Sequence, residues 1–240
     1  MKILAIGNSF STDSTRYLEE IALSNNEEFK VWNLYIGGCS LEQHLDNFKT
    51  GAPNYSLEER DNILRPISLQ EAILSDNWDY ITIQQASHYS GQISTYEPFI
   101  GEIINYIKDL APKSKIVFNR TWAYEIDSDH GAFPWYDKDQ EKMFKAILDA
   151  TNIITLKYNL PIIPVGDNVE KVRRTKEFDY RNGGLSLNRD GFHLSFDYGR
   201  YLAGLTWYKF FSEKETINPT FKPSGTNEEL IKVIKEVVLK

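Results

Sequence analysis

The sequence predicts a single α/β domain, in which a doubly wound parallel sheet of about five strands lies between two layers of helices. Short apolar runs rich in β-branched residues alternate with longer runs of helical spacing, a pattern typical of parallel strands connected through helices. The chain has 240 residues, which is enough for one full hydrophobic core and short for two. Hydrophobic residues make up 41% of the chain and charged residues 25%, as in folded globular proteins. Residues 1–240 are therefore expected to form one domain.

The chain begins with a strand, a turn and a helix. Lys2–Ile6 is a short apolar run, and the turn Gly7–Phe10 separates it from Thr12–Asn25, whose apolar residues recur on one helical face. Phe29–Ile36 has the apolar character of a second strand and ends at a pair of glycines.

The middle of the chain opens with a polar stretch. Residues 41–66 contain two prolines and are expected to be an insertion over one end of the sheet, followed by a helix near Leu69–Ser75. Asp79–Gln84 is expected to be the third strand, Pro98–Leu110 a helix, and Lys115–Tyr124 the fourth strand.

The last part of the chain continues the alternation. An aromatic loop, Trp122–Tyr136, leads into Lys138–Tyr158, where apolar residues at helical spacing predict a long helix. Pro161–Val165 is a β-branched fifth strand. Ser195–Phe211 and Asn227–Leu239 are expected to be the closing helices.

Ser9 follows the first strand and precedes the first helix. Ligands of doubly wound sheets bind outside the carboxyl ends of the strands, and a backbone N–H in this turn belongs to a helix N-terminus. The position therefore suits a serine nucleophile that generates an oxyanion. A structural interpretation is also open, because Ser9, Ser11 or Thr12 can serve as the N-cap of the helix.

A late segment places an acid beside a base. Asp190 and His193 are three residues apart, and the intervening Gly191 lets the carboxylate reach the imidazole. An imidazole with a pKa near ~6.5 can take a serine proton at neutral pH, while the carboxylate fixes its tautomer and stabilises the imidazolium. Taken alone, the spacing also fits a turn in which Asp190 is the N-cap of the next segment.

Together the two segments resemble the SGNH (GDSL-like) serine hydrolases. Gly7-Asn8-Ser9-Phe10 resembles the Gly-Asp-Ser block after that family's first strand, with Asn8 in place of Asp, and Asp190-Gly-Phe-His193 resembles the closing Asp-x-x-His block. The resemblance spans nearly the whole chain. It implies a three-layer, flavodoxin-like α/β/α fold and a catalytic triad of Ser9, His193 and Asp190.

The remaining blocks of the family supply the oxyanion hole. Its second block is a glycine after the second strand, a place held here by Gly38 or, as the alternative, Gly37, although a plain strand-ending turn explains the pair equally well. Its third block reads Gly-x-Asn-Asp, and this chain departs from it with Gln84-Gln85-Ala86-Ser87. Gln84 is the expected side-chain donor, with Gln85 and Ser87 as alternatives, because a Gln amide offers the same N–H from a longer arm.

Candidate substrate-binding residues lie near these blocks. His44 follows the glycine pair, and Trp122 and Tyr124 belong to the aromatic loop, where ring faces beside an arginine suit a sugar. Core packing explains Trp122 equally well. His88 and His130 could also contact a substrate, although loop histidines without a specific role are commoner.

Cys39 is the only cysteine of the chain. With His44 it could form a cysteine hydrolase, but a buried, inert thiol beside a glycine turn is the favoured interpretation. A single cysteine cannot form an internal disulfide, and no Cys/His cluster has the spacing of a zinc site. Neither a metal nor an organic cofactor is expected.

The charge balance bears on the partners. The chain has 27 basic and 34 acidic residues, a net charge of −7, so nucleic acids and anionic membranes are not expected partners. No apolar run approaches the roughly 20 residues that span a bilayer, and Met1 leads into a strand instead of a signal peptide. The chain as written is expected to be cytoplasmic, or secreted or periplasmic if a signal peptide had been removed. The sequence leaves the oligomeric state open.

The predicted function is hydrolysis of an ester through a covalent acyl-serine, with the oxyanion held by the N–H groups of Ser9 and Gly38 and the side chain of Gln84. O-acetyl groups on a sugar or polysaccharide are the favoured substrate, because of the aromatic loop. The alternatives are a lipid or thioester hydrolase with a long acyl pocket and a non-catalytic glycan-binding protein on the same fold, which the altered third block favours. A dinucleotide-binding protein is disfavoured, since no Gly-x-Gly-x-x-Gly follows the first strand.

Overall fold

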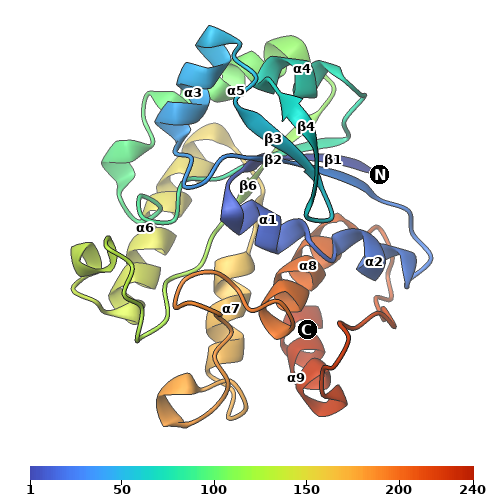
Figure 1. The fold of residues 1–240 in the computed structure, drawn as a ribbon, viewed down its shortest axis with the longest axis vertical. Helices are drawn as coiled ribbons and strands as arrows, with labels where there is room; N and C mark the ends of the chain where they lie inside the picture. The colour runs from blue at the N-terminus through green and yellow to red at the C-terminus, as the bar shows by residue number, and fades with distance from the viewer.

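A seven-stranded sheet runs through the centre of the molecule (Figure 1). The computed structural model describes all 240 residues. The strands lie in the order β4-β3-β2-β1-β5-β6-β7. Five of them are parallel: β1 (Lys2–Gly7), β2 (Lys30–Tyr35), β5 (Tyr80–Ile83), β6 (Lys115–Asn119) and β7 (Ile162–Ile163). The other two, β3 (Tyr55–Glu59) and β4 (Asn62–Ile67), form an antiparallel hairpin on the outer side of β2.

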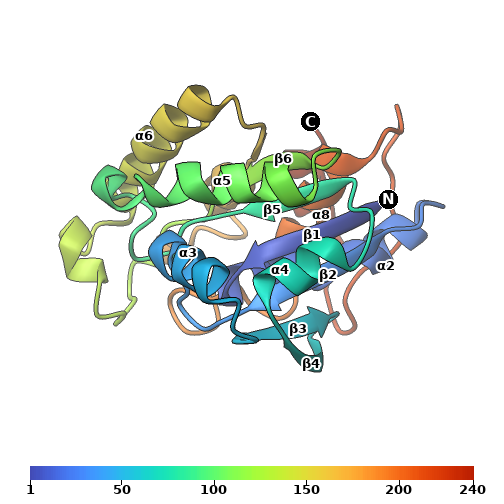
Figure 2. The same cartoon turned by 90° about the horizontal axis from the view of Figure 1, so that it is seen from above.

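Helices cover both faces of this sheet, as Figure 1 shows. One face, on which Figure 2 looks down, carries α3 (Leu41–Thr50), α4 (Leu69–Leu74) and α5 (Phe99–Leu110). The other carries α1 (Ser9–Thr15), α2 (Leu18–Leu23), α7 (Val165–Arg173), α8 (Tyr198–Phe211) and α9 (Glu228–Leu239). The long α6 (Gln140–Tyr158) contributes Met143 and Ile147 to one core and Ala150 and Ile154 to the other.

Side chains of β1 show how the two cores arise. Ile3 and Ala5 belong to the core under α8, whereas Leu4 and Ile6 belong to the core under α5. Successive side chains of a strand point to opposite faces, so a central strand covered on both sides must be apolar throughout. The predicted three-layer α/β/α architecture with a doubly wound parallel sheet is confirmed, and all five expected strands are parallel members of the sheet.

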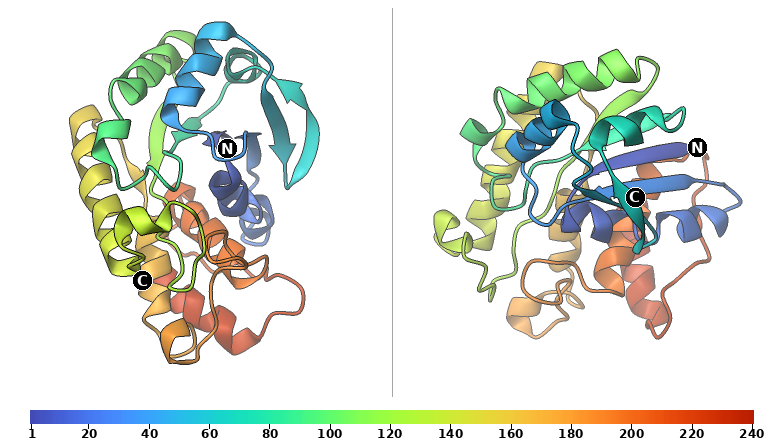
Figure 3. Two further views of the ribbon diagram at one scale, coloured as in Figure 1. Left: turned by 60° about the vertical axis from the view of Figure 1, so that its left-hand side comes forward. Right: turned by 45° about the horizontal axis from the view of Figure 1, so that its top comes forward.

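The sheet has seven strands instead of the expected five, because the region 41–66 holds regular structure. It forms α3 and then the β3–β4 hairpin, which extends the sheet at the edge opposite to β7 (Figure 3). The sequence pattern of a strand is weak in β4 because Asn62–Pro66 is exposed to solvent. Pro66 lacks the N–H for a second neighbouring strand, and it is tolerated because β4 is an edge strand.

Two further elements differ from expectation. The first helix is interrupted after Thr15, so that α1 and α2 replace the single helix Thr12–Asn25. The helix α7 was not expected, yet Val165, Val169 and Val172 recur at helical spacing and are buried. None of the helices is long and apolar enough to serve as a membrane span.

Candidate active site

The parallel register brings several turns to one edge of the sheet. Gly7 of β1 is paired with Tyr35 of β2, and Ile6 is paired with Ile83 of β5. The residues that follow these strands therefore meet at the carboxyl edge, where doubly wound sheets bind their ligands. Ser9, the glycine pair and the Gln84–Ser87 turn are the residues concerned.

Ser9, His193 and Asp190 form a continuous hydrogen-bonded relay. Ser9 Oγ lies 2.8 Å from His193 Nε2, and His193 Nδ1 lies 2.7 Å from Asp190 Oδ2. Asn8, and not Ser9, is the N-cap of α1, since its side-chain oxygen accepts the N–H of Phe10 at 3.0 Å. The Ser9 hydroxyl is therefore not used in capping and is directed to the imidazole.

The turn that carries Asp190 orients its carboxylate. Asp190 Oδ1 accepts the backbone N–H groups of Phe192 (3.2 Å) and His193 (2.7 Å), which leaves Oδ2 for the imidazole. Burial alone would raise the pKa of Asp190, but the hydrogen bonds from His193 and Phe192 lower it below its ordinary value. Gly191 has φ +83°, and a Cβ there would lie 2.8 Å from Ser128 Cα. Only glycine fits this turn without strain.

A buried ion cluster ties the His193 segment to α1. Asp13 is fully buried and accepts hydrogen bonds from Arg189 Nη1 (3.0 Å), Arg200 Nε (2.8 Å) and the backbone N–H of Leu194 (2.9 Å). Burial raises the pKa of Asp13, and the two guanidinium groups oppose that increase. Because Asp13 lies one helical turn after Ser9, the same helix carries the candidate nucleophile and holds the segment of the candidate base. Sequence reasoning missed this cluster.

Trp122 supports the site from inside the protein. Its ring stacks on Phe10 with centroids 4.1 Å apart and planes within 5°, and its Nε1 donates to the carbonyl of Phe192 at 2.8 Å. Trp122 is completely buried, so it offers no face to a substrate, and packing is the correct interpretation of this residue. Its contacts hold Phe10, beside Ser9, against the turn that contains His193.

Gln84 lies within a buried chain of amides. Its Nε2 donates to Asn8 Oδ1 at 3.0 Å, and its Oε1 accepts from Asn119 Nδ2 at 2.8 Å. Asn119 Oδ1 in turn accepts from Trp207 Nε1. The amide of Gln84 therefore positions Asn8, which is the N-cap next to Ser9. Gln84 was expected to be a free oxyanion donor, but its amide N–H is already engaged in this contact.

The alternatives in the same turn are also engaged. Gln85 Oε1 accepts the N–H of Leu41 at 3.0 Å and its Nε2 donates to the carbonyl of Thr95, so Gln85 links this turn to α3. Ser87 Oγ lies 2.9 Å from the hydroxyl of Tyr124, a buried residue whose hydroxyl is 3.5 Å from His130 Nε2. Tyr124 is thus a buried residue that connects Ser87 with His130, and like Trp122 it presents no ring face to solvent.

The glycine pair borders the same turn. Asn8 Nδ2 donates to the carbonyl of Cys39 at 3.2 Å, which fastens this loop beside Ser9. Gly38 has φ +62°, and a Cβ there would meet no atom within 4 Å, whereas a Cβ at Gly37 would lie 3.4 Å from the hydroxyl of Tyr35. The backbone conformation at position 38 therefore favours glycine, and Gly38 faces open space.

His44 is buried on α3 and does not reach the surface. Its Nδ1 lies 2.8 Å from the hydroxyl of Tyr55 and 3.4 Å from Cys39 Sγ. Burial lowers the pKa of His44 to about 3, so it stays neutral at physiological pH. The expectation that His44 contacts substrate is wrong for this reason.

We expect Cys39 to be inert in the folded protein. Burial raises the pKa of its thiol to about 12, which leaves almost no thiolate at pH 8. Iodoacetamide at pH 8 should leave the native protein unmodified and should alkylate Cys39 after denaturation, as peptide mass mapping can show. Alkylation of the native protein with loss of activity would support a cysteine nucleophile instead.

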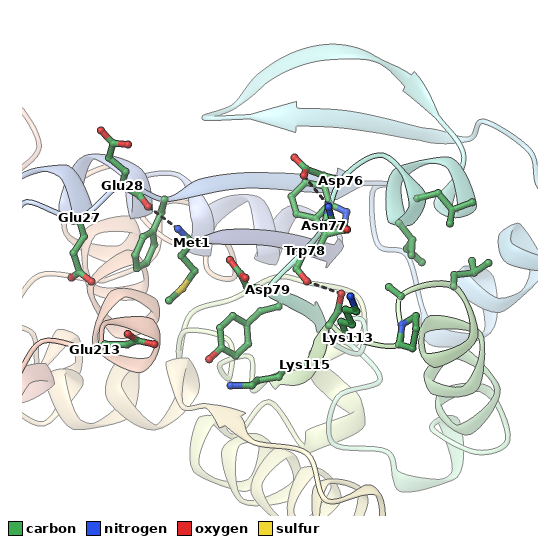
Figure 4. Close-up of a pocket in the computed structure, with 18 residues that line it drawn as sticks. Met1, Glu27, Glu28, Asp76, Asn77, Trp78, Asp79, Lys113, Lys115 and Glu213 are labelled. Carbon is green, nitrogen blue, oxygen red and sulfur yellow. Dashed lines mark hydrogen bonds between the residues drawn. The ribbon is translucent and has the colours of Figure 1, made fainter.

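A large surface concavity lies at the opposite edge of the sheet from these residues. It has a volume of about 970 Å³ and is lined by Met1, Asp79 and Lys115, which lie where β1, β5 and β6 begin (Figure 4). The parallel strands all end at the carboxyl edge, near Ser9, and all begin at the opposite edge of the sheet. The concavity lies at that opposite edge and is not part of the candidate active site. No three His, Cys, Asp or Glu side chains are placed so as to hold a metal ion.

The sheet order and the relay at its carboxyl edge define the class: the chain has the fold of the SGNH hydrolases. A proposed SGNH hydrolase from Slackia heliotrinireducens has a TM-score of 0.58 and 19% identity, with 88% of this chain and 99% of that chain covered. An acetyl xylan esterase, AlAXEase, has a TM-score of 0.59 and 13% identity, with 88% and 100% covered. No curated protein matches the chain.

Within this class the particular family is also defined. Residues 2–239 match the family described as Domain of unknown function (DUF4886), and the chain belongs to it. A crystal structure of a DUF4886 family protein from Bacteroides uniformis is 32% identical, with a TM-score of 0.92, and covers 99% of this chain and 93% of that one.

Proposed function

We propose that the chain is a serine esterase of the SGNH type that hydrolyses O-acetyl esters of a carbohydrate. The observation that carries the proposal is the relay itself, with 2.8 Å between Ser9 Oγ and His193 Nε2 and 2.7 Å between His193 Nδ1 and Asp190 Oδ2. Both distances lie within the reach required of a nucleophile, its base and the group that orients the base. The three side chains are aligned for proton transfer.

In the proposed mechanism His193 Nε2 takes the proton of Ser9 as Ser9 Oγ attacks the ester carbonyl carbon. The tetrahedral intermediate collapses when the imidazolium returns the proton to the leaving alcohol, which leaves an acyl ester on Ser9. Water then attacks this ester by the same proton transfers and releases the carboxylic acid and free Ser9. Asp190 stays ionised throughout and stabilises the imidazolium, in accord with its lowered pKa.

The oxyanion hole in this proposal is built from backbone groups. Ser9 is the first residue of α1, so its N–H has no acceptor within the helix and lies at the positive end of the helix dipole. The N–H of Gly38 likewise has no backbone acceptor in the protein. Gln84 contributes indirectly, because it fixes the Asn8 side chain that caps α1 and fastens the loop of Cys39.

A short acyl group fits the surroundings of Ser9 better than a long chain. Neither Ser9 nor His193 lines the concavity of about 970 Å³, so that space does not serve as an acyl pocket for the nucleophile. A long-chain lipase or thioesterase would need such a pocket to desolvate its acyl chain. The fold shared with an acetyl xylan esterase agrees with an acetylated sugar as substrate.

A fluorophosphonate probe tests the proposal directly. We expect stoichiometric labelling of the wild type on the peptide that contains Ser9, no labelling of Ser9→Ala, and unchanged labelling of Ser11→Ala, a matched serine on the same helix. Hydrolysis of p-nitrophenyl acetate should exceed that of long-chain p-nitrophenyl esters. Labelling at another residue, or folded protein that is neither labelled nor active, would refute the esterase. Sugar binding without turnover would then favour a glycan-binding protein.

A further inference from the structure

A series of rings leads from His193 to the protein surface. Phe192 contacts His193 with ring centroids 4.2 Å apart, and His130 contacts Phe192 at 4.8 Å. His88 follows at 6.3 Å from His130, and Trp135 lies 6.1 Å from His88. Tyr89 completes the set, stacked on Trp135 at 6.0 Å. We call these five residues, Phe192, His130, His88, Tyr89 and Trp135, the ring band.

Exposure increases along the ring band. Phe192, His130, His88 and Tyr89 are half-buried, whereas Trp135 is 54% exposed, one of the largest apolar side chains left open to solvent in this protein. The band therefore begins at the candidate base and ends on the surface. Single exposed apolar residues are common, whereas contiguous apolar surface marks binding sites, and this line of rings starts at the candidate base.

The backbone that carries Trp135 is fixed by buried neighbours. Trp135 belongs to the short helix η2 (Phe133–Tyr136), whose first and last residues are buried. Tyr136 donates its hydroxyl to the carbonyl of His88 at 2.9 Å and accepts the N–H of Gly91 at 3.2 Å. A Cβ at Gly91 would lie 2.7 Å from the Tyr136 ring, so these loops pack as closely as backbone and ring allow. The exposed ring is thus preorganised by a fixed support.

The pKa values of both imidazoles of the ring band lie below the ordinary value of histidine, which favours their neutral form at pH 7. Burial lowers the pKa of His130, and His193 lowers it further, while nearby Asp129 and Asp190 act in the opposite direction. Burial and the proximity of His130 likewise lower the pKa of His88. His130 Nδ1 accepts the N–H of Ala132 at 3.1 Å, which places the ring proton on Nε2. Each neutral ring offers a face and single donor or acceptor atoms.

The side chains of the ring band favour one class of ligand, a neutral sugar. Apart from His193, the charged groups that act on His130 are the carboxylates of Asp129 and Asp190, which disfavour an anionic ligand. Flat ring faces combined with isolated hydrogen-bonding atoms suit the C–H faces and hydroxyl groups of a neutral sugar.

We propose that the ring band is the subsite for the neutral carbohydrate portion of the substrate, with Trp135 as the outer stacking platform. The inference rests on the proposed function, because it places the sugar on the alcohol side of the ester that Ser9 attacks. Trp135 acts on binding and takes no part in the transfer of protons at His193. This subsite differs from the expected substrate contacts of Trp122 and Tyr124, which are buried.

Steady-state kinetics of Trp135→Ala test the subsite. With a panel of O-acetylated xylo-, manno- and cello-oligosaccharides, we expect the KM of the best substrate to rise about 3- to 10-fold and kcat to change little, as expected for loss of one stacking contact. Trp135→Phe should recover most of the affinity. Hydrolysis of p-nitrophenyl acetate, which has no sugar, should stay within about twofold of the wild type. Leu156→Ala, an exposed residue on α6, is the control for surface truncation.

A binding measurement separates failure of the subsite from failure of the proposed function. In the Ser9→Ala background, titration calorimetry with the same panel should show binding that Trp135→Ala weakens by the same factor. If wild-type protein hydrolyses the acetylated sugars but Trp135→Ala leaves KM and binding unchanged, the subsite is refuted and the esterase stands. If no ester is hydrolysed but Trp135-dependent binding persists, the esterase is refuted and the subsite stands. Absence of binding to the entire panel overturns the subsite.

Discussion

Replacing His193 with alanine should lower kcat for p-nitrophenyl acetate by about 10⁴-fold or more, because the variant retains the nucleophile without a base to accept its proton. His193 is the only side chain within hydrogen-bonding distance of Ser9 Oγ, at 2.8 Å. The side chains of His193 and Asp190 are 20% and 40% exposed, so the truncation leaves a solvent-accessible space and no buried polar group without a partner. Circular dichroism and the melting temperature should therefore stay close to those of the wild type.

Chemical rescue provides the control for this prediction. Imidazole added at millimolar concentration can enter the space left by His193 and act as the base, so it should restore part of the activity of His193→Ala and none of that of Ser9→Ala. Asp190→Asn should fall between the wild type and His193→Ala, because the asparagine oxygen can still accept the two backbone N–H groups while its amide nitrogen opposes the required tautomer. Unchanged turnover in His193→Ala would exclude its role as base.

The sequence predicted the buried parts of the fold better than its exposed edge. Strands such as β1 and β5 are covered on both faces, so they appear as short, continuously apolar runs between helices. The strand β4 is exposed at the edge of the sheet, and its order depends on pairing with β3, which no periodicity along its own segment reveals. The break between α1 and α2 is not visible in the apolar spacing, which continues through it.

Some residues of the candidate site could likewise be predicted from the sequence, and others could not. Ser9, Asp190 and His193 were predicted as a triad because their two short blocks together resemble those of SGNH hydrolases, and the structure brings the three side chains within hydrogen-bonding distance. Whether a polar side chain such as Gln84 or His44 is free or engaged depends on neighbours that are distant in sequence. Gln84, for example, lies 76 residues from its partner Asn8. Local sequence contains no information about such partners.

The ion cluster of Asp13 could not be predicted from local sequence, because its partners Arg189 and Arg200 are 176 and 187 residues away. We expect Asp13→Asn to lower the free energy of unfolding by about 3–5 kcal/mol, because it leaves two guanidinium groups without their buried counter-charge. The side chain of Arg200 is only 9% exposed, so solvent cannot compensate for the loss. Urea denaturation of wild type and variant measures the difference.

Asp76→Asn is the matched control, because Asp76 also pairs with two cations, Lys2 and Lys30, but these lysines are 45% and 37% exposed. Solvent and salt screen such pairs, so we expect a much smaller loss of stability, which decreases further in 0.5 M NaCl, whereas the loss in Asp13→Asn should persist. Below its unfolding transition, Asp13→Asn should also show a lower kcat with little change in KM, since Asp13 holds the Leu194 N–H beside His193. Equal losses of stability in the two variants, or full activity in Asp13→Asn, would mean that the buried cluster does not position the catalytic segment.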